Sequence, residues 1–149
     1  MRLAFAFAAT AAALVALGAT AVLADQDPIA ARQALMKENG KHAKMGVAMI
    51  KGEAPFDLAK AKEIFVTFEH AAAKMPDLVP PNSKTGGDTT ASPKIWENMA
   101  DFKARFEKLG ADAKAAEASV KDLAAFKTAF GGLGKDCGGC HETYRIKKN

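Results

Sequence analysis

Apolar residues recur at steps of three and four along four segments of the chain. The segments cover residues 28–50, 58–75, 92–109 and 123–144. Steps of this size place residues on one face of an α-helix, because the helix advances about 100° per residue. The pattern therefore predicts four amphipathic helices, each with one face turned to a shared core.

The residues on these four faces are the predicted core. They are Ile29, Gln33, Met36, Gly40, Ala43, Val47 and Ile50; Leu58, Ala61, Phe65, Phe68, Ala72 and Met75; Ile95, Met99, Phe102, Phe106 and Leu109; Leu123, Phe126, Phe130, Leu133, Cys137, Cys140 and Tyr144. His42, Met45 and Met49 are displaced from the first face. Gly131, Gly132 and Gly134 are expected to loosen the last helix.

The segment boundaries carry helix start and stop signals. Asp57 is a predicted N-cap, and Ser92-Pro93 supplies a cap followed by proline at the first helical position. Gly110 is expected to weaken the third helix without ending it. The connection 77–91 is rich in Pro, Gly, Ser and Thr and is predicted to be too polar for the core. Two short turns and one longer link indicate an all-α fold, an antiparallel four-helix bundle.

The last predicted helix contains Cys137-Gly138-Gly139-Cys140-His141. This C-x-x-C-H run is the attachment motif of a covalently bound haem c, one per chain. Residues three and four positions apart share a helix face, so both thiols and the imidazole of His141 can converge on one macrocycle. Gly138 and Gly139 fill the positions where side chains would crowd a ring lying close to the backbone.

Two other interpretations of the cysteine spacing remain open but fit less well. A thioredoxin-like dithiol, with enzyme activity, needs a βαβ setting, and no strand-like alternation lies near Cys137. A closed zinc site needs four ligands, whereas the chain has two Cys and three His. The histidine directly after the second cysteine favours haem attachment, and we expect the protein not to be an enzyme.

Residues 1–24 have the composition of a secretory signal peptide. Arg2 precedes an apolar, Ala-rich stretch that ends on small residues at Ala24, and the polar sequence Asp25-Gln26-Asp27 follows. An uncleaved membrane anchor is the alternative, because the stretch is about long enough to span a bilayer. We expect cleavage after Ala24, a single domain over residues 25–149, and location in the bacterial periplasm.

The charge of the chain is mildly basic. The formal net charge is +4, and loss of Arg2 with the leader would leave about +3. Lys135, Arg145, Lys147 and Lys148 gather near the cysteine motif. They either steer an acidic redox partner or complement the end of the last helix. Neither nucleic acid nor a stable membrane anchor is indicated, and a homodimer through the first two helices is possible.

Four segments together carry a likeness to a known family. Residues 32–40, 51–57 and 92–96 and the motif from Cys137 to Arg145 resemble the class II cytochromes c, the family of cytochrome c prime and its low-spin cytochrome c-556 relatives. The resemblance covers essentially the whole chain after the leader. It implies that His141 is the proximal iron ligand, that Cys137 and Cys140 form the thioethers, and that three further residues lie near the haem. These are Arg32, Gln33 and Thr89.

The resemblance also places Met36 over the opposite, distal face of the haem. In the cytochrome c-556 type a methionine here binds iron, and the protein is a low-spin electron carrier with iron held by His141 and Met36. In cytochrome c prime the same position shields an open, five-coordinate, high-spin iron that binds nitric oxide or carbon monoxide. We expect the first, because Met36 lies on the predicted core face; the second remains the alternative.

Overall fold

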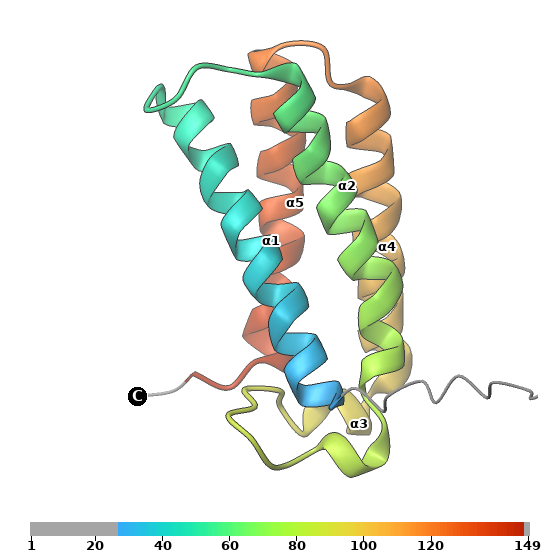
Figure 1. The fold of residues 1–149 in the computed structure, drawn as a ribbon. Coiled ribbons are helices and arrows are strands. Elements are labelled where there is room, and N and C mark those ends of the chain that lie inside the picture. The colour runs from blue at the N-terminus through green and yellow to red at the C-terminus, as the bar shows by residue number, and fades with distance from the viewer. Residues whose placement is uncertain (1–26, 148–149) are drawn as a thin grey trace, which may run out of the picture.

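The computed structural model describes residues 27–147, which form an antiparallel four-helix bundle (Figure 1). The long helices are α1 (Pro28–Lys51), α2 (Leu58–Lys74), α4 (Met99–Ser119) and α5 (Leu123–Tyr144). The connection between α2 and α4 holds two 3₁₀ turns, η1 (Met75–Leu78) and η2 (Pro81–Ser83), and the short helix α3 (Lys94–Glu97). The beginning of α1 and the end of α5 lie at the same end of the bundle, beside this connection.

Three aspartates begin the long helices α1, α2 and α5. A side-chain oxygen of Asp27 accepts a hydrogen bond from the amide of Ile29 at 2.9 Å. Asp57 and Asp122 accept from amides three residues further on, at 3.0 and 2.8 Å. Each bond satisfies an amide that has no partner within its helix. The predicted N-cap at Asp57 is confirmed.

Two aromatic groups fill the bundle interior. Phe126 lies at the centre of the first, with ring centroids 5.4 Å from Phe65 and 5.3 Å from Phe130. Phe102 links the second, 5.0 Å from Phe106 and 5.4 Å from Tyr144. The predicted core faces of α2, α4 and α5 account for most of these rings, and Leu58, which is 40% exposed, is the exception on α2.

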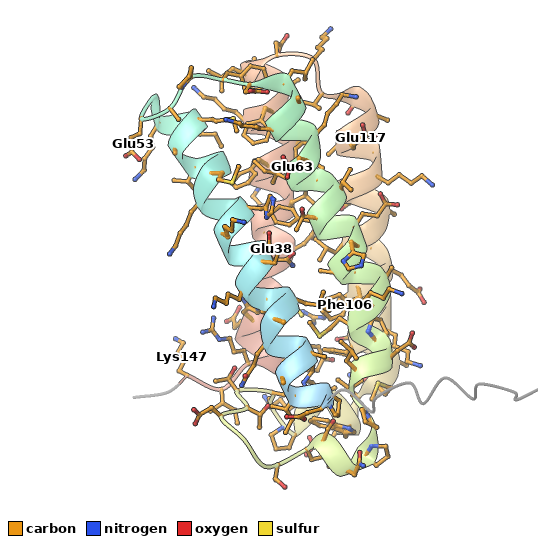
Figure 2. All side chains as sticks on the ribbon, in the orientation of Figure 1. Glu38, Glu53, Glu63, Phe106, Glu117 and Lys147 are labelled. Carbon is orange, nitrogen blue, oxygen red and sulfur yellow. The ribbon has the colours of Figure 1, made fainter. Side chains whose placement is uncertain are left out.

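The buried face of α1 differs from the prediction. The residues it buries are Ile29, Arg32, His42, Gly46 and Met49, whereas Gln33 and Val47 are exposed. His42 turns toward α2, where its Nε2 lies 3.6 Å from an oxygen of Glu63, and its Nδ1 lies 3.2 Å from an oxygen of Glu38 (Figure 2). The hydrophobic pattern missed this face because three of its five members are polar or lack a side chain.

The region around the third predicted helix also needs correction. The helix is divided at Asn98, whose φ of −135° and ψ of 58° are not helical, so that α3 and α4 are separate elements. The predicted start signal is confirmed, because the hydroxyl of Ser92 accepts a hydrogen bond from the amide of Lys94 at 3.3 Å and Pro93 has helical dihedral angles directly before α3. The connection 77–91 is not wholly outside the core, because Val79 and Ser83 are buried. Gly110 lies inside α4, as predicted, and the glycines of α5 leave that helix continuous.

The predicted leader lies outside the described residues. Between residues 27 and 147, none of the helices has both the length and the apolar character needed to cross a bilayer.

Gly46 of α1 lies directly against the Phe130 ring of α5. A Cβ built at this position would lie 2.4 Å from Cε2 of Phe130, and the Phe130 ring is held in place by Phe126 and by Phe68, 6.4 Å away. A side chain here would force the two helices apart or displace the ring.

We predict that Gly46→Ala lowers the free energy of unfolding by about 1–3 kcal/mol. Gly131→Ala is the matched control, because nothing lies within 4 Å of a Cβ at that exposed position of α5. The control should gain roughly 0.5–1 kcal/mol from the better helix propensity of alanine. Denaturant unfolding followed by circular dichroism measures both, and a Gly46→Ala variant as stable as the parent would contradict the close packing.

Candidate functional site

A cavity of about 500 Å³ opens in the half of the bundle that carries the α2–α4 connection. Its walls come mainly from α1, the first half of α4 and the last half of α5, and α2, η1, the segment 89–91 and α3 contribute the rest. Apolar side chains form most of the lining, among them Ile29, Phe68, Met75, Ile95, Phe102, Phe106 (Figure 2) and Leu109. A cavity of this size falls within the range that holds small-molecule cofactors, about 300–1,000 Å³.

The C-x-x-C-H segment lies on the cavity side of α5. Cys137 and Cys140 are half-buried, free of disulfides, and line the cavity together with His141. Burial raises the pKa of both thiols, and the charge of Asp136 adds to the effect at Cys137. Partial burial, followed by the positive charge of Arg145, lowers the pKa of His141. A lowered pKa favours neutral imidazole, the form that binds a metal.

Arg32 of α1 binds the connection 78–89 through hydrogen bonds. Its Nη1 donates to the carbonyl of Leu78 at 2.6 Å and to the hydroxyl of Ser83 at 2.8 Å. Its Nη2 donates to the carbonyl of Ser83 at 3.0 Å and to the hydroxyl of Thr89 at 3.3 Å. The guanidinium also lies 5.9 Å from the ring centroid of Trp96. These four bonds use every Nη proton and leave only the Nε proton for a group inside the cavity.

Burial lowers the pKa of Arg32, and the negative charge of Asp27 opposes that effect. Although Arg32 is only 6% exposed, its guanidinium stays charged, because four hydrogen bonds to acceptors compensate for the lost water. The residue therefore orders the connection that borders the cavity.

The far side of the connection is fixed to the end of α5. The amide of Ser92 donates to the carbonyl of Tyr144 at 2.9 Å, and the amide of Ile146 donates to the carbonyl of Thr90 at 2.8 Å. This short bridge places segment 89–91 across the end of the cavity. The chain thus closes the cavity between Arg32 on one side and the bridge on the other.

The structure brings all seven predicted site residues to one cavity. Cys137, Cys140 and His141 of α5 share it with Arg32, Gln33 and Met36 of α1 and with Thr89 of the connection. Gln33 and Met36, which lie off the buried face of α1, are thus accounted for by the cavity. His42, Met45 and Met49 are not among its lining residues.

Sequence patterns missed several polar residues of the lining, among them Asn39 and Arg105. Asn39 lines the cavity, and its side-chain oxygen is buried in the wall without a hydrogen-bond partner. Arg105 follows Phe102 by three positions on α4, and this spacing beside the apolar face could have indicated that Arg105 lies near the cavity. The donor set of the described residues also tests the zinc interpretation, because no three His, Cys, Asp or Glu side chains between residues 27 and 147 are placed to hold a metal ion.

Together, these features define a four-helix-bundle protein with an internal cofactor cavity bearing two thiols and an imidazole. The sequence model of the family "Cytochrome C'" matches residues 27–145. The chain belongs to the cytochrome c′ family, whose members, cytochrome c′ and cytochrome c-556, are electron-transfer haem proteins. The cofactor is haem c, with iron at its centre.

Two similar proteins and one solved structure illustrate this relationship. Cytochrome c′ of Rhodopseudomonas palustris is 45% identical over 141 residues, which cover 95% of this chain and 97% of that protein. Cytochrome c-556 of Agrobacterium fabrum is 41% identical over 118 residues, 78% of this chain and 80% of that protein. A solved structure of Rhodopseudomonas palustris cytochrome c′ has a TM-score of 0.80 and 45% identity, covering 83% of this chain and 98% of its own.

The cavity suits haem c by its chemistry as well as by its volume. Its apolar lining matches the two faces of a porphyrin, two thiols are available for thioether bonds, and an imidazole is available for the iron.

We predict that Arg32→Leu lowers the free energy of unfolding by about 2–3 kcal/mol, because the carbonyls of Leu78 and Ser83 and the hydroxyl of Ser83 lose the hydrogen bonds that they accept from the guanidinium. Relative to the parent protein, amide hydrogen exchange should accelerate in residues 78–90 and change less in α2. Lys84→Ala is the control, since Lys84 is exposed and its Nζ only lies 6.0 Å from the Trp96 ring centroid. Unchanged exchange in 78–90 would show that other contacts hold the connection.

Proposed function

We propose that this protein is a periplasmic electron carrier whose low-spin haem iron is held by His141 and Met36. The observation that carries the proposal is the common cavity, because α1 brings Met36 to the same apolar space to which α5 brings His141. His141 and Met36 from opposite helices would occupy both axial positions. With both positions filled, electron transfer is the remaining chemistry and no small ligand has an open site.

Each residue of the cavity has a defined part in this proposal. Cys137 and Cys140 would form the thioether bonds, and His141 would bind iron through its neutral imidazole. Haem c supplies a one-electron couple between ferrous and ferric iron. Gln33 and Thr89 line the cavity and would donate to polar groups of the haem at its edge, whereas Arg32 has one free proton for that purpose.

Export and partners follow from the same proposal. Residues 1–24 would direct the chain to the periplasm and be removed after Ala24, leaving the domain 25–149. Lys135, Arg145 and Lys147 are exposed, and Lys147 lies at the cavity end of the bundle (Figure 2). We expect a redox protein with an acidic surface to dock there, with a rate that falls as salt screens the charges.

A second function is favoured by one comparison. The relative that is 45% identical over almost the whole chain is a cytochrome c′ and not a cytochrome c-556. If Met36 shields the iron without binding it, the protein would be a five-coordinate, high-spin haem protein that binds nitric oxide or carbon monoxide. The two functions differ in one iron bond, so the spectrum of the iron separates them.

We predict that the ferrous parent protein has a low-spin spectrum that does not change when carbon monoxide is added. Met36→Ala should open the distal position, giving a high-spin or water-bound iron and rapid binding of carbon monoxide. Met45→Ala is the matched control, because Met45 lies on the same helix and packs against the core outside the cavity. Rapid binding of the gas by the parent at neutral pH would favour the second function.

We further predict that the haem stays with the polypeptide after unfolding in acid. Intact-mass measurement should give the mass of the polypeptide plus one haem, with neither thiol open to alkylation. The double variant Cys137→Ser/Cys140→Ser should release its haem under the same conditions. A parent protein with the bare polypeptide mass and two reactive thiols would rule out covalent attachment.

A further inference from the structure

Arg105 joins α4 to the haem attachment segment of α5. Its Nη1 donates to the carbonyl of Gly139 at 3.0 Å, between the two cysteines of the motif. The hydroxyl of Thr143 shares this carbonyl at 3.3 Å. Arg105 also lines the cavity, so its positive charge lies against the space that haem c fills.

Asp101 and Tyr144 fix the position of this guanidinium. Nε of Arg105 donates to Oδ2 of Asp101 at 2.7 Å, and the hydroxyl of Tyr144 donates to the same oxygen at 2.5 Å. The guanidinium carbon lies 5.3 Å from the centroid of the Tyr144 ring, which is 4% exposed. Each of the three side chains is thus held by the other two, and Asp101 itself does not line the cavity.

The ionisation states of the three groups are well separated. Hydrogen bonds from Tyr144 and then from Arg105 lower the pKa of Asp101. The bond to Asp101 raises the pKa of Arg105, and burial followed by the contact with Asp101 raises the pKa of Tyr144 to about 12. At neutral pH the group therefore contains one anion, one cation and a neutral phenol.

A fixed charge beside a haem changes its reduction potential. The ferric state carries one more positive charge than the ferrous state, so a nearby cation disfavours oxidation and raises the potential, while an anion lowers it. The effect is larger at a half-buried wall than in water, because solvent screens the charge less.

We propose that Asp101 and Arg105 are a charge pair that sets the reduction potential of this cytochrome. The positive charge of Arg105, held against the attachment segment, raises the reduction potential. Asp101 is a positioning residue that orients Arg105, and its negative charge partly offsets the effect of Arg105 on the potential. This inference rests on the proposed electron-carrier function, since it assigns the residues that tune the carrier. It does not depend on which residue occupies the distal side of the iron.

The test measures the reduction potentials of holoprotein variants at neutral pH by spectroelectrochemical titration. Arg105→Gln should lower the potential, Asp101→Asn should raise it, and the double variant should lower it by less than Arg105→Gln alone. Lys103→Gln removes the same charge from an exposed position of α4 and is the matched control. The shift for Arg105→Gln should be at least about threefold larger than that of the control.

A purely structural role gives a different pattern. Loosening of the pocket would admit water in both single variants and move both potentials in the same direction, which would overturn the proposal. Arg105→Lys keeps the charge and should restore most of the potential, even if Arg105→Gln folds poorly; a potential as low as that of Arg105→Gln would also overturn it.

The same samples separate this inference from the proposed function. Carbon monoxide binding and the spin state of the parent report on Met36, whereas the opposite signs of the two potential shifts report on the charge pair. A high-spin parent with opposite shifts would reject the low-spin carrier and keep the pair. A low-spin parent in which both single variants shift the potential in the same direction would keep the low-spin carrier and reject the charge pair.

Discussion

The contact between Gly46 and the Phe130 ring separates the half of the bundle with a packed interior from the half that contains the cofactor cavity. Because Gly46 has no Cβ, α1 can lie directly on the ring, and the bundle closes at that level. The cofactor cavity begins on the other side of this contact, where α1 presents Gln33, Met36 and Gly40. One half of the bundle is thus a packed aromatic core and the other half is built to hold a large flat group.

The open half needs a border that does not collapse into the cavity. Arg32 supplies it by binding the connection 78–89 through four hydrogen bonds, and the bridge of segment 90–92 to the end of α5 completes it. A buried guanidinium is expensive unless its protons are satisfied, so the connection and Arg32 stabilise one another. The long polar connection is therefore a part of the cofactor site.

Membership of the cytochrome c′ family identifies the cofactor but does not decide between a low-spin and a high-spin iron, which depends on the residue at the distal face. A cavity wall that holds a methionine can either complete the coordination of iron or shield an open position, and the fold is the same in both cases. The names of the relatives divide along this line, between cytochrome c′ and cytochrome c-556. What separates the two functions is whether the sulfur of Met36 binds the iron, not the architecture that surrounds it.

By itself the sequence determined the long helices and the bundle class, and together with the family resemblance it predicted seven of the residues that meet in the cavity. Hydrophobic periodicity and helix caps are local in the chain, and the C-x-x-C-H motif encodes its geometry in the spacing of one helix. Only the tertiary structure decided the buried face of α1, the break at Asn98, and the places of Val79, Ser83, Asn39 and Arg105. Polar residues at such positions follow no periodic pattern, because their burial depends on partners that are distant in sequence. Ser83 lies 51 residues from Arg32, and Gly139 lies 34 residues from Arg105.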